Sequence, residues 1–301
     1  MKKLREGFVA FAYLAAWRIV RWLPEKSAYS IFYSLGAKLE KRKGKSVLRL
    51  RSNLRQVKPE LSERELDELL TLSMHSYLRY WCDTFRFPDW STERIAGTVE
   101  LTNGHLLIDA LESNTGIVVA LPHAGNWDHA GAYFCGKGAK LVTVAERLKP
   151  EALFRRFLEY RQAIGMEVLP LDGRVIATLA QRLRSGGLVA LVADRDLSKT
   201  GISVNFFDGI ARMPAGPALL ALNTGVPLLT AYVSYTPVGI HIEFRKVTIP
   251  TEGTQQEKVL SIVQRCADNF ADGIAAHPED WHMMQRIWID ADFKELSLIH
   301  I

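Results

Sequence analysis

A histidine and an aspartate lie five residues apart just after an apolar stretch of the chain. Residues 117–121 are apolar and rich in β-branched side chains, a composition typical of a buried strand. Pro122 ends this strand, because proline cannot donate a hydrogen bond to a sheet. His123 comes next, and Asp128 follows near the start of the next element. A carboxylate that holds an imidazole in one tautomer makes it a general base for a hydroxyl group, so this pair predicts acid–base chemistry.

The residues around His123 favour that interpretation over a structural one. A single histidine after a strand is more often part of a loop or core, and the His-x4-Asp spacing is common by chance. Here, however, Asn126 can cap a helix over residues 127–136, which places His123 between a strand and a helix. Open α/β sheets bind their ligands at the carboxyl ends of strands, so we expect His123 to lie in a site.

A second apolar stretch, residues 188–192, also ends in charged groups, beginning with Asp194 and Arg195. Strands of one sheet bring their carboxyl ends to the same edge, so Asp194 can approach His123. Asp128 and Asp194 are therefore both candidates for the partner of the imidazole. The structural alternative for Asp194 is an ion pair with Arg195 or a loop cap.

Three further charged residues are candidates for the same edge of the sheet. Glu146 follows a predicted strand, and its alternative role is a salt bridge. Arg161 lies near the end of a predicted helix over residues 151–164, where an arginine complements the helix dipole. Arg212 precedes a predicted helix over residues 215–223. Because helix amino ends favour phosphate groups, Arg212 is our candidate contact for a phosphate of coenzyme A or of a lipid.

Other chemistries lack their motifs in this chain. There is no Gly-x-Ser-x-Gly, and no serine or cysteine has an evident base beside it, so a covalent acyl-enzyme is not implied. Neither a P-loop nor Gly-x-Gly-x-x-Gly occurs. His277 and His282 lack cysteine or acidic residues at ligand spacing, so we expect no metal and no permanently bound cofactor.

The elements that would position these residues alternate between strands and helices from residue 99 onward, which predicts an α/β sandwich. We expect the whole chain, residues 1–301, to form one such domain, since no linker divides it. The expected strands span residues 99–101, 117–121, 141–145, 167–169, 188–192, 227–233 and 240–246, and the expected helices span residues 104–112, 127–136, 151–164, 175–184, 215–223 and 255–276.

The first 85 residues predict a helical front end packed on the sheet. Its helices are expected over residues 4–23, 25–41, 47–57 and 62–85, the last one opened by a capping box from Ser62 to Glu65. Residues 1–55 hold 14 Lys and Arg against 3 Asp and Glu, a net charge of +11, whereas the rest of the chain carries −6.

Basic residues interleaved with aromatic ones, as in Trp17-Arg18-Ile-Val-Arg21-Trp22, suit a helix lying on an anionic membrane surface. Nucleic acid would suit the same charge, but no nucleic-acid-binding motif occurs and we expect no such partner. A solvated basic face is the structural alternative. The chain holds no apolar run long enough to cross a bilayer and no secretory signal, so we expect a peripheral protein on the cytoplasmic face of the plasma membrane.

His123-Ala-Gly-Asn-Trp-Asp128 resembles the His-x4-Asp motif of the bacterial lipid A acyltransferases, which are part of the glycerolipid acyltransferase superfamily. The match is more specific to one branch, the phosphatidylinositol mannoside acyltransferases of actinobacteria, and covers roughly residues 13–288. It extends through Val144-Ala-Glu-Arg-Leu-Lys-Pro-Glu151, Tyr160-Arg161, Glu167-Val-Leu-Pro-Leu171, Arg195-Asp196-Leu197, Phe206-Phe207, Arg212-Met-Pro214, Ala276-His-Pro278 and Asp280-Trp-His-Met283.

This resemblance implies a mixed central sheet flanked by helices and assigns roles to several residues. The family has a glutamate at the position of Asp194, where it orients the histidine, so this chain departs by one methylene group. Arg161 matches an arginine that orients a sugar or stabilises the developing oxyanion. Glu146, Arg195 and His282 match positions in the polar substrate pocket.

The function implied is transfer of a long acyl chain, expected to be palmitoyl, from acyl-CoA to a mannose hydroxyl of a phosphatidylinositol mannoside. His123 would be the general base for direct attack by that hydroxyl. Two alternatives remain open: acylation of another glycolipid, such as a lipid A precursor, and lipid binding without catalysis on the same fold.

Overall fold

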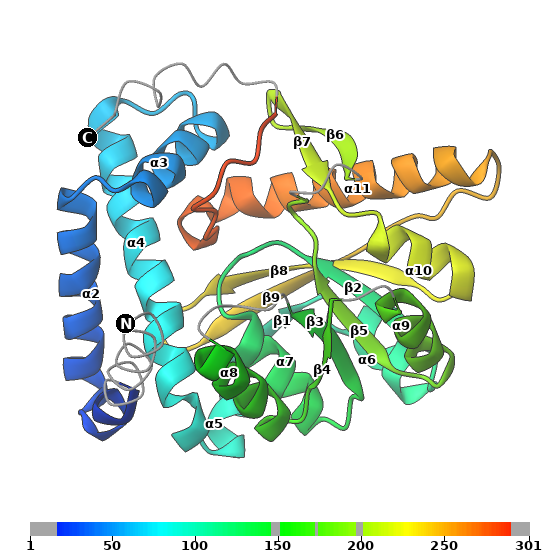
Figure 1. The fold of residues 1–301 in the computed structure, drawn as a ribbon, viewed down its shortest axis with the longest axis horizontal. Coiled ribbons are helices and arrows are strands. Elements are labelled where there is room, and N and C mark those ends of the chain that lie inside the picture. The colour runs from blue at the N-terminus through cyan, green and yellow to red at the C-terminus, as the bar shows by residue number, and fades with distance from the viewer. Residues whose placement is uncertain (1–16, 146–150, 172–173, 197–200, 290–301) are drawn as a thin grey trace.

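The computed structural model describes residues 17–145, 151–171, 174–196 and 201–289. A seven-stranded sheet forms the centre of the molecule (Figure 1), with strand order β1-β9-β8-β2-β5-β3-β4. Its strands are β1 (Val99–Thr102), β2 (Ile117–Leu121), β3 (Leu141–Ala145), β4 (Glu167–Pro170), β5 (Leu188–Val192), β8 (Leu228–Tyr235) and β9 (Ile240–Lys246).

Five of these strands run in one direction, and β1 and β9 run in the other. Strands β4, β3, β5, β2 and β8 pair in parallel, β9 pairs antiparallel with β8, and β1 pairs in parallel with β9. The predicted α/β class and the mixed central sheet are thus confirmed.

Each face of the sheet packs against its own layer of helices, because successive side chains of a strand point to opposite faces. In β2, Val118 and Ala120 face one apolar core, and Ile117, Val119 and Leu121 face the other. The first core is completed by α9 (Val175–Arg184), α10 (Gly216–Thr224) and α11 (Gln255–Ala276), and the second by α6 (His105–Glu112) and α7 (Trp127–Gly136).

The front end forms a third apolar core beside the sheet. It contains α2 (Glu25–Lys41), α3 (Lys45–Val57) and α4 (Glu63–Arg86), and α2 runs alongside α4 (Figure 1). The predicted capping box at the start of α4 is confirmed: the Ser62 N–H donates to the Glu65 carboxylate at 2.8 Å, and the Glu65 N–H donates to the Ser62 hydroxyl at 3.3 Å. A short 3-10 turn, Phe87–Asp89, and α5 (Thr92–Gly97) connect α4 to β1.

Sequence analysis missed one hairpin, made of β6 (Ile202–Phe206) and β7 (Gly209–Met213). The two strands are joined by Phe207 and Asp208, and Phe207 has a positive φ of 50°. Two-residue hairpin turns that need positive φ usually contain asparagine or glycine, so a phenylalanine there gives no turn signal. The hairpin packs on the same core as α11.

In the part of the chain that the structure describes, no helix is both long enough and apolar enough to cross a bilayer.

Candidate active site

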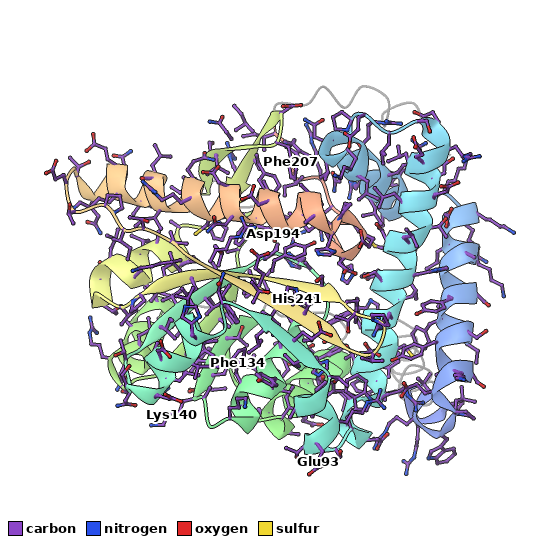
Figure 2. The ribbon with its side chains drawn as sticks, turned by 180° about the vertical axis from the view of Figure 1, so that it is seen from behind. Glu93, Phe134, Lys140, Asp194, Phe207 and His241 are labelled. Carbon is purple, nitrogen blue, oxygen red and sulfur yellow. The ribbon has the colours of Figure 1, made fainter. Side chains whose placement is uncertain are left out.

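His123 and Asp194 are brought together by the register of two parallel strands. In the β2–β5 pair, Leu121 lies opposite Val192, and these are the last residues of their strands. His123 and Asp194 each follow two residues later, so both leave the sheet at the same height. Asp194 lies in the interior between the sheet and α11 (Figure 2), and its side chain is 0% exposed.

The Asp194 carboxylate contacts His123 through both of its oxygens. Oδ1 lies 2.6 Å from the imidazole Nδ1, and Oδ2 accepts the backbone N–H of His123 at 3.0 Å. Oδ2 also accepts the indole N–H of Trp281 at 3.0 Å. With a carboxylate beside it, Nδ1 carries the proton, which leaves Nε2 as the basic nitrogen.

Burial by itself raises the pKa of the Asp194 carboxyl, since it penalises the charged form. The positive charge of a protonated His123 and the hydrogen bonds from His123 and Trp281 outweigh that penalty, so the net pKa lies below the ordinary value for aspartate. Asp194 therefore remains a carboxylate in neutral solution.

The imidazole is partly exposed. The side chain of His123 is 33% exposed, and among the described residues Nε2 has no hydrogen-bond partner. The ring of Trp127 meets the imidazole edge-on, with the ring centroids 6.0 Å apart. A hydroxyl group can thus reach Nε2, which is the arrangement a general base requires.

The loop between His123 and the helix depends on a glycine and an asparagine. Gly125 has a positive φ of 56°, and a Cβ there would lie 2.5 Å from the carbonyl oxygen of Val233. The Asn126 side chain accepts the N–H of His129 at 3.0 Å and caps α7, as predicted. His129 is buried, and its Nε2 lies 3.2 Å from the carbonyl oxygen of Ile95, so it has a structural role.

Asp128, the second candidate partner of His123, has other partners in the structure. Its carboxylate accepts Arg161 Nε at 2.8 Å and the Tyr80 hydroxyl at 3.1 Å. Arg161 lies in the last turn of α8 (Glu151–Ala163), but its guanidinium points at Asp128. Burial lowers the pKa of Arg161, but the Asp128 charge, the hydrogen bond to Asp128 and the nearby Tyr80 and Tyr160 together raise it overall, so the guanidinium stays charged. Asp128 thus holds Arg161 close to the loop formed by residues 123–126, which we call the histidine loop.

The predicted substrate residues are dispersed around this centre. Glu146 falls outside the described residues. Arg195 follows Asp194 and is partly buried, and its Nε has no hydrogen-bond partner among the described residues. Arg212 lies in β7, where its carbonyl accepts the N–H of Asp196 at 2.7 Å. Arg212 thus precedes α10, as predicted, but it belongs to the missed hairpin.

His282 lies beside the histidine loop, but it is buried. Its backbone N–H donates to the carbonyl of His123 at 2.7 Å, and its Nε2 lies 2.8 Å from the Ser76 hydroxyl. Burial, aided by the nearby charge of His123, lowers the pKa of His282 to about 3, so the ring is neutral. No cluster of three or more metal-ligating side chains occurs among the residues described.

Sequence reasoning missed Ser76, Asp280 and Trp281, which join α4 and the end of the chain to this site. The Ser76 hydroxyl donates to Asp280 at 2.5 Å, and Trp281 is completely buried against Asp194. The resemblance had pointed to residues 280–283, but no pattern in a single sequence tells that a tryptophan so far along the chain reaches Asp194.

The chain was compared with known proteins. A family model described as bacterial lipid A biosynthesis acyltransferase matches residues 1–289. A phosphatidylinositol mannoside acyltransferase of Mycolicibacterium smegmatis is 41% identical over 280 residues, which cover 92% of this chain and 90% of the relative. One of Mycobacterium tuberculosis H37Rv is 41% identical over 290 residues, covering 95% and 90%. The chain therefore belongs to the bacterial lipid A biosynthesis acyltransferase family.

Proposed function

We propose that this protein transfers a long-chain acyl group, palmitoyl in our expectation, from acyl-CoA to a mannose hydroxyl of a phosphatidylinositol mannoside. One observation carries the chemistry: His123 has one ring nitrogen held by a buried carboxylate, its other ring nitrogen has no hydrogen-bond partner among the described residues, and its side chain is partly exposed. The substrate is supported by the two mycobacterial relatives, whose names give it and which match nearly the whole chain.

In the proposed mechanism, Nε2 of His123 accepts the proton of the sugar hydroxyl as its oxygen attacks the thioester carbonyl carbon. A tetrahedral oxyanion forms. Its collapse breaks the carbon–sulfur bond, and the leaving thiolate takes the proton from the imidazolium. The products are the sugar ester and free coenzyme A, so no covalent acyl-enzyme is needed.

Asp194 supports this cycle in two ways. It keeps the proton of the neutral imidazole on Nδ1, and its negative charge stabilises the imidazolium formed during attack. Arg161, fixed by Asp128, is our candidate for the group that orients the sugar or stabilises the oxyanion. Arg195, Arg212, His282 and Glu146 remain candidate substrate contacts.

Acyl release from palmitoyl-CoA by the purified protein tests the activity and the acceptor together. We expect phosphatidylinositol mannoside to stimulate coenzyme A release, with the acyl group recovered on a mannose, and a lipid A precursor to give little stimulation. Acyl-CoA donors of other lengths establish the chain preference. Stimulation by the lipid A precursor alone would contradict the proposed acceptor, and no acyl-CoA cleavage with any acceptor would contradict the proposed donor.

We further propose that the front end docks on the cytoplasmic surface of the plasma membrane. Large apolar side chains are exposed there next to basic ones: Trp22 is 77% exposed, and Ile31 and Leu35 lie one turn apart on α2. Arg18 and Lys26 are exposed nearby. An apolar face flanked by cations suits an anionic lipid surface.

Vesicle co-sedimentation tests this docking. Binding to phosphatidylglycerol vesicles should exceed binding to phosphatidylcholine vesicles and fall with salt, because each basic residue near the surface contributes about 1 kcal/mol. Trp22→Ser should weaken binding, whereas Val238→Ser, at an exposed apolar residue between β8 and β9, should not. Equal binding to both vesicles, or equal effects of the two variants, would contradict the proposal.

A further inference from the structure

Residues 280–283, which we call the closing segment, come after α11 and lie along the histidine loop; Asp280 is also the last residue of a short 3-10 turn, Pro278–Asp280. The Gly125 N–H donates to the carbonyl of Asp280 at 2.9 Å, and Ala124 forms an antiparallel bridge with Trp281. On the other side, Asp280 accepts the Tyr235 N–H at 2.7 Å. The closing segment is thereby fixed to the loop that carries His123 and to strand β8.

From this position Trp281 reaches the second oxygen of Asp194. Its indole N–H is an uncharged donor that does not give up its proton. The ring is completely buried and contacts Phe206 and Trp288, so the direction of the N–H is fixed. Oδ2 of Asp194 accepts this N–H and the backbone N–H of His123, both at 3.0 Å. Two fixed donors therefore determine the orientation of the carboxylate plane.

We infer that Trp281 is a positioning residue for the His123–Asp194 pair: its indole N–H fixes the carboxylate so that Oδ1 faces the imidazole. This inference rests on the proposed role of His123 as the base. Without the indole donor, Oδ2 retains one fixed partner and the carboxylate can rotate about that bond. A less ordered carboxylate holds Nδ1 less firmly, and the effect appears in the transition state, where the imidazole gains charge.

The pH profile separates positioning from packing. Loss of the indole N–H removes a hydrogen bond that stabilises the charged carboxylate, so the pair holds its proton more tightly. The acid limb of the kcat/KM profile should then move to higher pH. Other groups near Asp194 are His282, which is neutral because its pKa is about 3, Tyr232, and Asp280, whose pKa burial raises to about 6.

The experiment compares Trp281→Phe with Trp288→Phe. Trp288 belongs to the same aromatic cluster, is also buried, and donates its indole N–H to the carbonyl of Phe206. Both changes shrink a buried ring and remove one N–H, so they should lower the melting temperature alike. Only Trp281→Phe should reduce kcat, by about tenfold or more, with KM for acyl-CoA unchanged and the acid limb shifted. Equal kcat and equal acid limbs in the two variants would overturn the inference.

A double variant excludes an effect through Asp280. In the Asp194→Asn background, Trp281→Phe should cause no further loss, because the charge through which Trp281 acts is gone. If Trp281→Phe lowered kcat in the Asp194→Asn background as much as it does in the wild-type background, or shifted the acid limb equally, the inference would be overturned. If Trp281→Phe does not fold, proton NMR spectra of the indole N–H groups in the wild type and in Asp194→Asn provide the test. One of the seven tryptophan N–H signals should move upfield in Asp194→Asn. No movement would refute the contact between Trp281 and Asp194.

His123→Ala distinguishes this inference from the proposed function. If that variant retains acyl transfer, both the proposed role of His123 and the inference on Trp281 are refuted. If it is inactive while Trp281→Phe behaves as Trp288→Phe does, only the role of Trp281 is refuted.

Discussion

Replacing His123 with alanine is expected to reduce acyl transfer by about 10²–10⁴-fold, because the hydroxyl then has no group to accept its proton. The fold should be retained, since the side chain is partly exposed and contributes little to the core. Initial rates with palmitoyl-CoA and the mannoside acceptor, alongside circular dichroism, measure both.

His241→Ala is a matched control, because His241 lies on β9 and bonds to Thr102 away from the site. It should leave the rate near that of the wild type. A folded His123→Ala protein with near-normal transfer would show that another group acts as the base.

The second large effect is expected for Asp194→Asn, and the reason lies in its two oxygens. Oδ2 faces two N–H donors, from the His123 backbone and Trp281, so the amide oxygen of asparagine takes that position. The amide NH2 then points at Nδ1 of His123 and donates to it. The imidazole is forced to carry its proton on Nε2, the nitrogen that must act as the base. Turnover should fall about 10²–10⁴-fold with little change in acyl-CoA affinity.

Nitrogen-15 spectra of the histidines report this tautomer directly, with a protonated Nδ1 in the wild type and a protonated Nε2 in Asp194→Asn. Asp128→Asn gives the contrast. It leaves Arg161 without its buried anion, and removing one partner of such a pair costs about 3–5 kcal/mol, so this variant should lose stability while His123 keeps its tautomer. If Asp194→Asn left turnover and the His123 tautomer unchanged while Asp128→Asn changed the tautomer, Asp128 and not Asp194 would be the carboxylate that orients His123.

Asp194→Glu introduces the glutamate that the resemblance implies for this position, at a site where Asp194 is completely buried. Overpacking by one methylene group typically costs about 1–3 kcal/mol. The variant should therefore be less stable than the wild type but more active than Asp194→Asn, because it keeps the charge.

The sequence predicted most of the sheet and the edge at which the chemistry lies. Strands β2 and β5 were predictable because each is a short apolar run that ends in polar residues, and parallel pairing then brings those ends together. Their register was not predictable. The sequence alone left both Asp128 and Asp194 as candidate partners for His123, with Asp128 as the fallback, and it is the pairing of Leu121 with Val192 that places Asp194 on the imidazole.

Residues that act across long sequence separations were beyond reach for another reason. Ser76 and Trp281 appear in the sequence as parts of a helix and of a coil, and although the resemblance covers residues 280–283, nothing in the sequence links either residue to Asp194 or His282. Their roles follow from how α4 and the closing segment pack around the histidine loop. The hairpin that carries Arg212 was missed because the Phe207-Asp208 turn carried no recognisable signal.

The place of the closing segment in the chain also bears on when the enzyme becomes competent. His123 and Asp194 are synthesised well before Trp281, and at ~5–20 residues per second the delay between the first and the last is on the order of ten seconds. During that interval the nascent sheet can form, but the carboxylate has no indole donor and Ala124 in the histidine loop has no bridge to Trp281. Completion of the site is thus coupled to translation of residues 280–283, so a chain that still lacks them holds the His123–Asp194 pair without its fixed orientation.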